Sequence, residues 1–151
     1  MTVYHVLVPI DFSPYAEQAL AYAITIAQKL QARVTLLHVI QPPLVAGADM
    51  GAWPSPTFLQ ELETAITRDM AGYLARVTAA GLAGEIVIVH GVPFQEILDT
   101  AKARQVDLII MGTHGRTGLS HILLGSVAER VVRLAPCPVL IARQPTPVAV
   151  S

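Results

Sequence analysis

The sequence predicts an α/β domain built on a single doubly wound sheet of five parallel strands in the order 3-2-1-4-5, with four helices. Short apolar runs, typical of strands covered on both faces, alternate with longer stretches of helical periodicity. Strands that alternate with helices indicate a parallel sheet with right-handed crossovers. The 151 residues suffice for one such domain, without an internal repeat or a linker.

The predicted elements follow from these runs and from turn signals along the chain. Ser13 followed by Pro14 is typical of a helix start, because serine caps the first amides and proline tolerates the first helical position. Thr57 with Gln60 matches a capping box and predicts a second helix start. We expect strands at 4–9, 34–40, 85–90, 108–111 and 139–141, and helices at 14–30, 57–80, 93–105 and 126–134.

Two segments fall outside this alternation. The stretch from Gln41 to Pro56 is rich in proline and glycine and, at about sixteen residues, is longer than the usual connection. We expect it to form a mobile loop beside the site. The tail at 144–151 is predicted to be flexible, which leaves 1–143 as the folded domain.

The composition is apolar and low in charge. Hydrophobic residues make up 53% of the chain and charged residues only 14%, so much of the surface must be apolar, which favours self-association. The net charge is −1 and the basic residues are scattered, so no nucleic-acid partner is expected.

Membrane insertion and secretion are not expected either. The longest stretch with little charge, 34–60, is broken by prolines and glycines, so it cannot form an apolar helix of about 20 residues. The N-terminus begins with a predicted strand and lacks the basic and cleavage regions of a signal peptide. Cys137 is the single cysteine and cannot form an internal disulfide, which agrees with a cytoplasmic protein.

A glycine-rich connection between the fourth predicted strand and the fourth predicted helix is the candidate binding site. Gly112 and Gly115 are separated by two residues, and nine residues later come Gly125 and Ser126. Glycines let the backbone approach a ligand closely, and a helix start offers unpaired amides to phosphate oxygens. Ser126 also matches an S-x-x-E capping box with Glu129, so a capping role and a ligand role are both open.

A second stretch should meet this loop. In a sheet of this order, ligands bind beyond the carboxyl ends of the strands where the strand order reverses. That point lies between the first and fourth strands, so Pro9, Ile10 and Asp11 should come beside 111–115. Asp11 also suits the start of the helix that follows, where a carboxylate complements the helix dipole, and both roles are open for it.

Two stretches resemble the universal stress protein family in its ATP-binding branch: VLVPIDFSPYAEQAL at 6–20 and MGTHGRTGLSHILLGSVAERVVRLAPCPVLIAR at 111–143. The second contains G-2x-G-9x-G-[S/T], the pattern of that branch, with every fixed position met. The resemblance extends from about Tyr4 to Arg143. It implies a Rossmann-like fold of the adenine nucleotide alpha hydrolase-like type and a cytoplasmic, ATP-binding regulatory protein of the stress response.

The resemblance also implies a role for each residue around the predicted crevice. Pro9, Ile10 and Asp11 would line the adenosine, with Asp11 near the ribose, and the backbone of Val39 would meet the adenine. Mg²⁺ could accompany ATP, because magnesium needs few protein ligands and Asp11 could reach it. The contacts under the nucleoside and at the phosphates would come from Met111, Gly112, His114, Gly115, Arg116, Gly125, Ser126 and Val127.

Catalysis is not expected at this site. The chain has no G-x-x-x-x-G-K-[ST] motif, and its glycine loop holds no lysine to stabilise a phosphoryl group during transfer. Ser120 and His121 are adjacent but lack an acid at a recognisable spacing. We therefore expect slow or no ATP hydrolysis. The alternatives are an ATP hydrolase or adenylate-transfer enzyme of related fold, and a nucleotide-free interaction module.

The last predicted strand would lie at a sheet edge, where an apolar strand tends to pair. Members of the family commonly dimerise through this strand. The resemblance therefore implies a homodimer through Val139, Leu140 and Ile141, and it leaves room for a further, unidentified protein partner.

Overall fold

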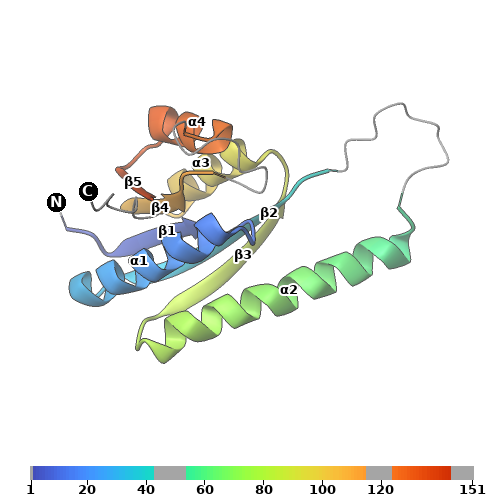
Figure 1. The fold of residues 1–151 in the computed structure, drawn as a ribbon, viewed down its shortest axis with the longest axis horizontal. Helices are drawn as coiled ribbons and strands as arrows, with labels where there is room; N and C mark the ends of the chain where they lie inside the picture. Colours follow the sequence, from blue (N-terminus) through green and yellow to red (C-terminus); the bar gives the residue numbers. More distant parts are fainter. Residues whose placement is uncertain (1, 43–53, 115–123, 144–151) are drawn as a thin grey trace, which may run out of the picture.

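The computed structural model describes residues 2–42, 54–114 and 124–143 (Figure 1). Its five strands pair in parallel in the order β3-β2-β1-β4-β5, which confirms the predicted sheet. The strands are β1 His5–Pro9, β2 Arg33–Ile40, β3 Gly84–His90, β4 Leu108–Gly112 and β5 Val139–Ala142. The helices are α1 Pro14–Leu30, α2 Pro56–Ala79, α3 Pro93–Ala103 and α4 Ser126–Leu134.

The predicted bounds of all the elements agree with these to within two residues. Three predictions fall on other parts of the chain. Most of the predicted mobile loop (43–53), Gly115 and Arg116 of the glycine motif, and the predicted tail (144–151) lie outside the described residues.

Helices cover both faces of the sheet (Figure 1). Because successive strand residues point to opposite faces, β1 sends Val6 and Val8 to one side and Leu7 to the other. The first side packs on α1 and α2, and the second packs on α3 and α4. Burial on both sides explains why the central strands read as continuous apolar runs in the sequence.

Small side chains let α1 lie close to the sheet. Ala16, Ala19, Ala23 and Ala27 recur at helical spacing, and each is at most 4% exposed. Because these methyl groups keep the helix axis near the strands, α1 contacts β4 and β5 as well as β1. The start of α1 is thereby held against the end of β4.

Serine and proline together start the first two helices. Ser13 Oγ accepts a hydrogen bond from Ala16 N at 3.2 Å, as predicted. The predicted capping box at Thr57 is wrong, because Ser55 caps α2 and its Oγ accepts from Phe58 N at 3.1 Å. The sequence Ser55-Pro56 decides the start: proline has the helical φ and lacks the amide that the first position would leave unpaired.

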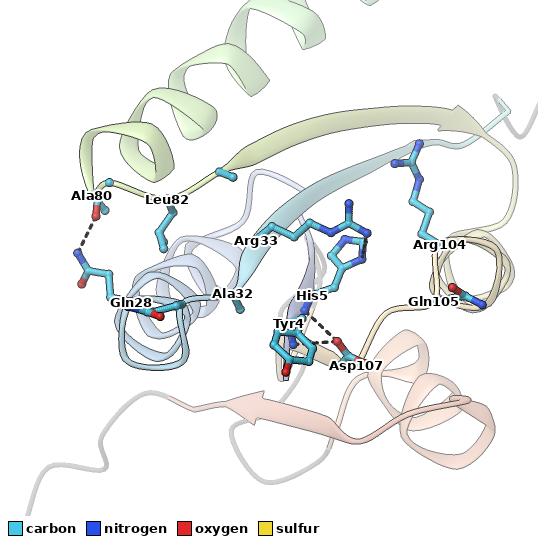
Figure 2. Close-up of a pocket in the computed structure, with 13 residues that line it drawn as sticks. Tyr4, His5, Gln28, Ala32, Arg33, Ala80, Leu82, Arg104, Gln105 and Asp107 are labelled. Carbon is cyan, nitrogen blue, oxygen red and sulfur yellow. Dashed lines mark hydrogen bonds between the residues drawn. The ribbon is translucent and has the colours of Figure 1, made fainter. Parts of the chain in front are cut away.

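A chain of polar side chains crosses the amino-terminal edge of the sheet. His5 is 2% exposed, and its Nδ1 accepts from Arg33 at 3.1 Å (Figure 2). Its Nε2 lies 2.7 Å from Thr35 Oγ1. Thr35 donates to Glu85 at 2.8 Å, and Glu85 also pairs with Arg104. Since arginine can only donate, His5 must be neutral, with its proton on Nε2. Burial, and then the Arg33 charge, lower the pKa of His5.

Acid should therefore weaken the fold through His5. Because the pKa of His5 is lowered in the folded chain, its contribution to stability is complete above its ordinary value of 6.5 and is lost as the pH falls towards the lowered value. Thermal melts between about pH 8 and about pH 5 should show a fall in Tm that is smaller in a His5→Asn variant. The asparagine oxygen can accept from Arg33 without titrating. Equal falls in both proteins would contradict this role.

Candidate functional site

The candidate site lies at the carboxyl edge of the sheet, where the strand order reverses between β1 and β4. Val6 pairs with Leu108 and Leu7 with Ile109, so both strands end at this edge. The fold therefore brings the predicted stretch 9–11 to the same edge as 112–114, although about a hundred residues separate them in the sequence.

Ile10 fixes the end of β1 to β2. Its side chain is 2% exposed, its amide donates to Leu37 O at 2.8 Å, and its carbonyl accepts from His38 Nδ1 at 2.7 Å. Because a carbonyl can only accept, the His38 proton in this contact is on Nδ1. Ile10 is thus a rigid, apolar part of the predicted crevice, next to Pro9 at the strand end.

Asp11 holds the turn that leads into α1. Its Oδ1 accepts from the Ser13 amide at 3.0 Å, in the side-chain to backbone pattern that aspartate makes two residues before a helix start. Of the two roles that the sequence left open, this contact shows the one at the helix start. A contact between Asp11 and a ribose or Mg²⁺ stays a prediction.

Phe12 is a site residue that the sequence analysis missed. Its φ is 65°, in the left-handed region that residues with a bulky side chain rarely enter. The ring centroid lies 4.7 Å from that of His38 and 5.8 Å from that of Tyr73, so Phe12 links the end of β1 to α2. No sequence signal marks a left-handed phenylalanine, because the conformation is imposed by this packing rather than by local propensity.

Gly112 has a packing role that the motif alone does not reveal. A Cβ atom at this position would lie 2.7 Å from Tyr15 Cβ and 2.9 Å from Tyr15 C. Since the second of these atoms belongs to the α1 backbone, it cannot move aside cheaply. Gly112 therefore has a role in packing, and its predicted place under a nucleoside stays a prediction. A bulky substitution there would disturb the fold before it tested a ligand.

His114 follows β4 and lies beside the start of α1. Its Nδ1 is 3.1 Å from Thr113 Oγ1, and its ring centroid is 5.3 Å from that of Tyr15. Its Nε2 is buried and has no hydrogen-bond partner within the described part of the chain. A buried ring nitrogen without a partner costs free energy, so it marks a position where a ligand atom would be favourable.

The start of α4 is tied directly to the end of β4. The Gly125 amide donates to Thr113 O at 2.7 Å, and Gly125 is the N-cap, with no side-chain hydrogen bond at this cap. The predicted capping box of Ser126 with Glu129 is wrong, because Ser126 is the first helical residue and is exposed. Within the described part of the chain, no capping contact uses its hydroxyl or the first-turn amides of α4, which favours the ligand role.

The other predicted site residues pack into the hydrophobic core or lie outside the described residues. Met111 is 6% exposed, and together with Val39 and Val127 it packs into the cluster beneath α3 and α4. Val39 also pairs with Val89 of β3 through the sheet. Gly115 and Arg116 lie in the undescribed segment.

The described residues contain neither a cluster suited to a metal ion nor a helix suited to a membrane. In ranges 2–42, 54–114 and 124–143, histidine, cysteine, aspartate and glutamate side chains form no group of three that could hold a metal ion. Over the same ranges, no helix has both the length and the apolar character that crossing a bilayer requires.

The comparison with known families decides which family this chain represents. The model of the universal stress protein family matches residues 3–143. The chain belongs to the universal stress protein family. This confirms the resemblance that the two motif stretches carry, over nearly the same residues as predicted.

Relatives and solved structures of universal stress proteins agree along nearly the whole chain. Universal stress protein MJ0531 of Methanocaldococcus jannaschii is 36% identical, over 93% of this chain and 82% of its own. Universal stress protein YxiE of Bacillus subtilis is 34% identical, over 91% and 97%. The structure of universal stress protein UspA from Lactobacillus plantarum superposes with a TM-score of 0.77 at 30% identity, over 95% and 99%.

Proposed function

We propose that this universal stress protein binds ATP in the crevice between β1 and β4 and acts as a cytoplasmic, nucleotide-dependent regulator. The observation that carries the proposal is that the end of β4 and the start of α4 meet at the hydrogen bond between Thr113 and Gly125. Among the described residues, the first-turn amides of α4 and His114 Nε2 have no hydrogen-bond partner, and they occur on the two segments that this 2.7 Å bond joins. Helix-start amides and a nearby ring nitrogen suit the oxygens of a phosphate chain.

Two structures of the same fold support adenine nucleotides as the ligand class. One universal stress protein, with a TM-score of 0.72 and 24% identity, is a complex with cAMP. Another, from Archaeoglobus fulgidus, with a TM-score of 0.63 and 21% identity, is a complex with dAMP. At these identities the likeness is one of fold, and it makes adenine nucleotides the first probes for this chain.

The proposed pose assigns the base and the phosphates to opposite sides of the crevice. Pro9, Ile10 and Asp11 would face the adenosine, the backbone of Val39 the adenine, and Met111 the nucleoside. The phosphates would lie at Gly125, Ser126 and Val127, near His114, with Gly115 and Arg116 adding contacts. Mg²⁺ would be held chiefly by phosphate oxygens and water.

Slow or absent hydrolysis belongs to the same proposal. Between Met111 and Val127 the sequence contains no lysine to stabilise charge on a transferred phosphoryl group. Asp11 directs one carboxylate oxygen to the Ser13 amide, which favours a role in the turn over a role as general base. A regulator that holds ATP without consuming it agrees with both observations.

The nucleotide content of the purified protein tests the proposal. The protein is denatured, and the released nucleotide is identified and quantified by ion-exchange chromatography. ATP close to one per chain supports binding without turnover, whereas ADP alone favours the alternative ATP hydrolase. Absence of nucleotide, together with a failed calorimetric titration with Mg-ATP, would overturn the nucleotide proposal.

We also propose that the protein is a homodimer through β5, with Val139, Leu140 and Ile141 at the interface. The Ile109 amide donates to Pro138 O, so residue 138 and alternate residues after it face β4, and the backbone of Val139 and Ile141 faces the open edge. An Ile141→Pro variant removes an outward amide and should elute as a monomer, while the parent elutes as a dimer in size-exclusion chromatography with light scattering. A dimeric variant would contradict pairing through this edge.

A further inference from the structure

A cleft of about 720 Å³ opens at the amino-terminal edge of the sheet, opposite the proposed nucleotide crevice. It is bounded by the ends of α1 and α3, by the turn between α2 and β3, and by the first residues of β1 and β2 (Figure 2). Its lining is rich in polar side chains, which include Gln28, Gln31, Arg33, Arg104, Gln105 and Asp107. A polar cleft of this size suits a small, hydrophilic ligand.

Arg33 brings a positive charge into this cleft without a matching negative partner. Its guanidinium donates to the neutral His5 ring at 3.1 Å, and in the described parts of the chain it forms no ion pair. Asp107 is the acid in the lining, but its Oδ2 accepts from the Tyr4 and His5 amides, both at 2.9 Å. A guanidinium has five donors, so most of those on Arg33 remain available to an anion.

The charge of Arg33 is not needed to balance the negative ends of the helices around the cleft. Carboxyl ends of helices carry partial negative charge and attract cations. Here α1 and α3 already carry Lys29 and Lys102 in their last turns, whereas Arg33 belongs to a strand. The ends of all three neighbouring helices are also closed by backbone bonds: Ala32 N to Ala27 O, Leu82 N to Val77 O and Val106 N to Ala101 O.

Two glutamines in the lining adopt a conformation that glycine would adopt more easily. Gln31 has a φ of 54° and Gln105 a φ of 51°, and both follow the end of a helix at the position where glycine is favoured. Gly81, at the end of α2, fills the equivalent position with a φ of 81°. Backbone strain of this kind is typical of functional positions, which fits a role for the glutamine side-chain amides in binding a ligand in the cleft.

We propose that this cleft binds a small metabolite through an oxyanion group, a phosphate or a carboxylate, which pairs with Arg33 and receives further hydrogen bonds from the glutamine amides. His5 acts as a positioning residue, because its neutral Nδ1 holds the guanidinium over the cleft. Arg104 also lines the cleft, where its guanidinium pairs with Glu85.

Titration of the ¹⁵N-labelled protein with inorganic phosphate, and separately with succinate, tests the proposal at constant ionic strength set with sodium chloride. Saturable shifts are expected at the amides of Tyr4, His5, Arg33 and Gln105. Phosphate bound in the nucleotide crevice instead would shift Gly125 and Ser126 in the same spectra, so the two sites are distinguishable. If only phosphate saturates, the ligand carries a phosphate group. If phosphate and succinate both saturate, the cleft is a general oxyanion site.

An Arg33→Gln variant should weaken binding at this cleft about tenfold or more, because it removes a charge-assisted hydrogen bond. Arg68→Gln is the matched control, since Arg68 is exposed on α2 and its loss changes the net charge equally. Linear, unsaturable shifts, or the same affinity in the parent and in Arg33→Gln, would overturn the proposal.

A Gln31→Gly variant separates binding from folding. Glycine fits the left-handed conformation, so Tm should stay equal or rise. If the Gln31 amide contacts the oxyanion, affinity falls at the same time. A rise in Tm with unchanged affinity would overturn the role of this glutamine in the site.

Discussion

A Gly125→Asp variant is expected to unfold at a higher temperature than the parent protein and to lose most of its affinity for ATP. Gly125 caps α4 with φ −61° and ψ 157°, which aspartate adopts without strain, and no side-chain hydrogen bond is made at this cap at present. An aspartate cap and its charge at the helix start should add roughly 0.5 to 1 kcal/mol to the free energy of unfolding.

The same carboxylate would repel phosphates held at this helix start. Two unit charges about 4 Å apart interact by about 4 kcal/mol at an effective dielectric constant near 20, so ATP affinity should fall at least about a hundredfold. Stability and binding therefore move in opposite directions, which a general folding defect cannot imitate. Calorimetric titration with Mg-ATP and thermal melts measure the two effects.

Gly125→Ser is the matched control for this prediction. Serine is also a good cap but carries no charge, so it should keep much of the gain in Tm and lose far less affinity. Tight ATP binding by the aspartate variant would show that the phosphates do not lie at the start of α4, and the proposed pose would fail.

Alanine substitutions at Gly112 and Gly72 should change stability in opposite directions. At Gly112 the new methyl group would lie 2.7 Å from Tyr15 Cβ and 2.9 Å from the Tyr15 backbone. Such overpacking costs about 1 to 3 kcal/mol. At Gly72, inside α2, a Cβ atom would meet nothing within 4 Å. There alanine should add about 1 kcal/mol to the free energy of unfolding, because glycine is the weaker helix former.

Urea denaturation of the two variants measures this difference. Each variant is a control for the other, because both replace glycine by alanine and only the surroundings of the new methyl group differ. A Gly112→Ala protein as stable as the parent would show that α1 can move away from β4, and that the contact with Tyr15 does not require glycine at this position.

Most of the fold was predictable because it depends on local and periodic signals. The strands β1, β2 and β4 are rich in apolar residues, and Ser13 with Pro14 leaves little choice for the start of α1. The errors occurred where two signals competed within a few residues. Ser55-Pro56 and Thr57 both suit a helix start, and Gly125 and Ser126 both suit a cap, so that only the folded chain shows which residue is used.

The sequence predicted which two stretches meet at the candidate site, but it did not predict the contacts that they make there. Strand order brings 9–11 and 112–114 to one edge, and the glycine spacing marks the helix start. The left-handed φ of Phe12 and the contact between Gly112 and Tyr15 depend on how α1 and α2 pack on the sheet. Such long-range packing leaves no pattern in a single sequence.

The short central strand β1 has a consequence for how the protein could respond to its surroundings. His5 begins it at the polar cleft, and Pro9 ends it at the proposed nucleotide crevice, about 13 Å away over four extended steps. A proton on His5 and a nucleotide in the proposed crevice would both act on this buried strand. If nucleotide binding changes the proton affinity of His5 by some factor, protonation of His5 must change the nucleotide affinity by the same factor. The protein would then respond jointly to pH and to the level of ATP.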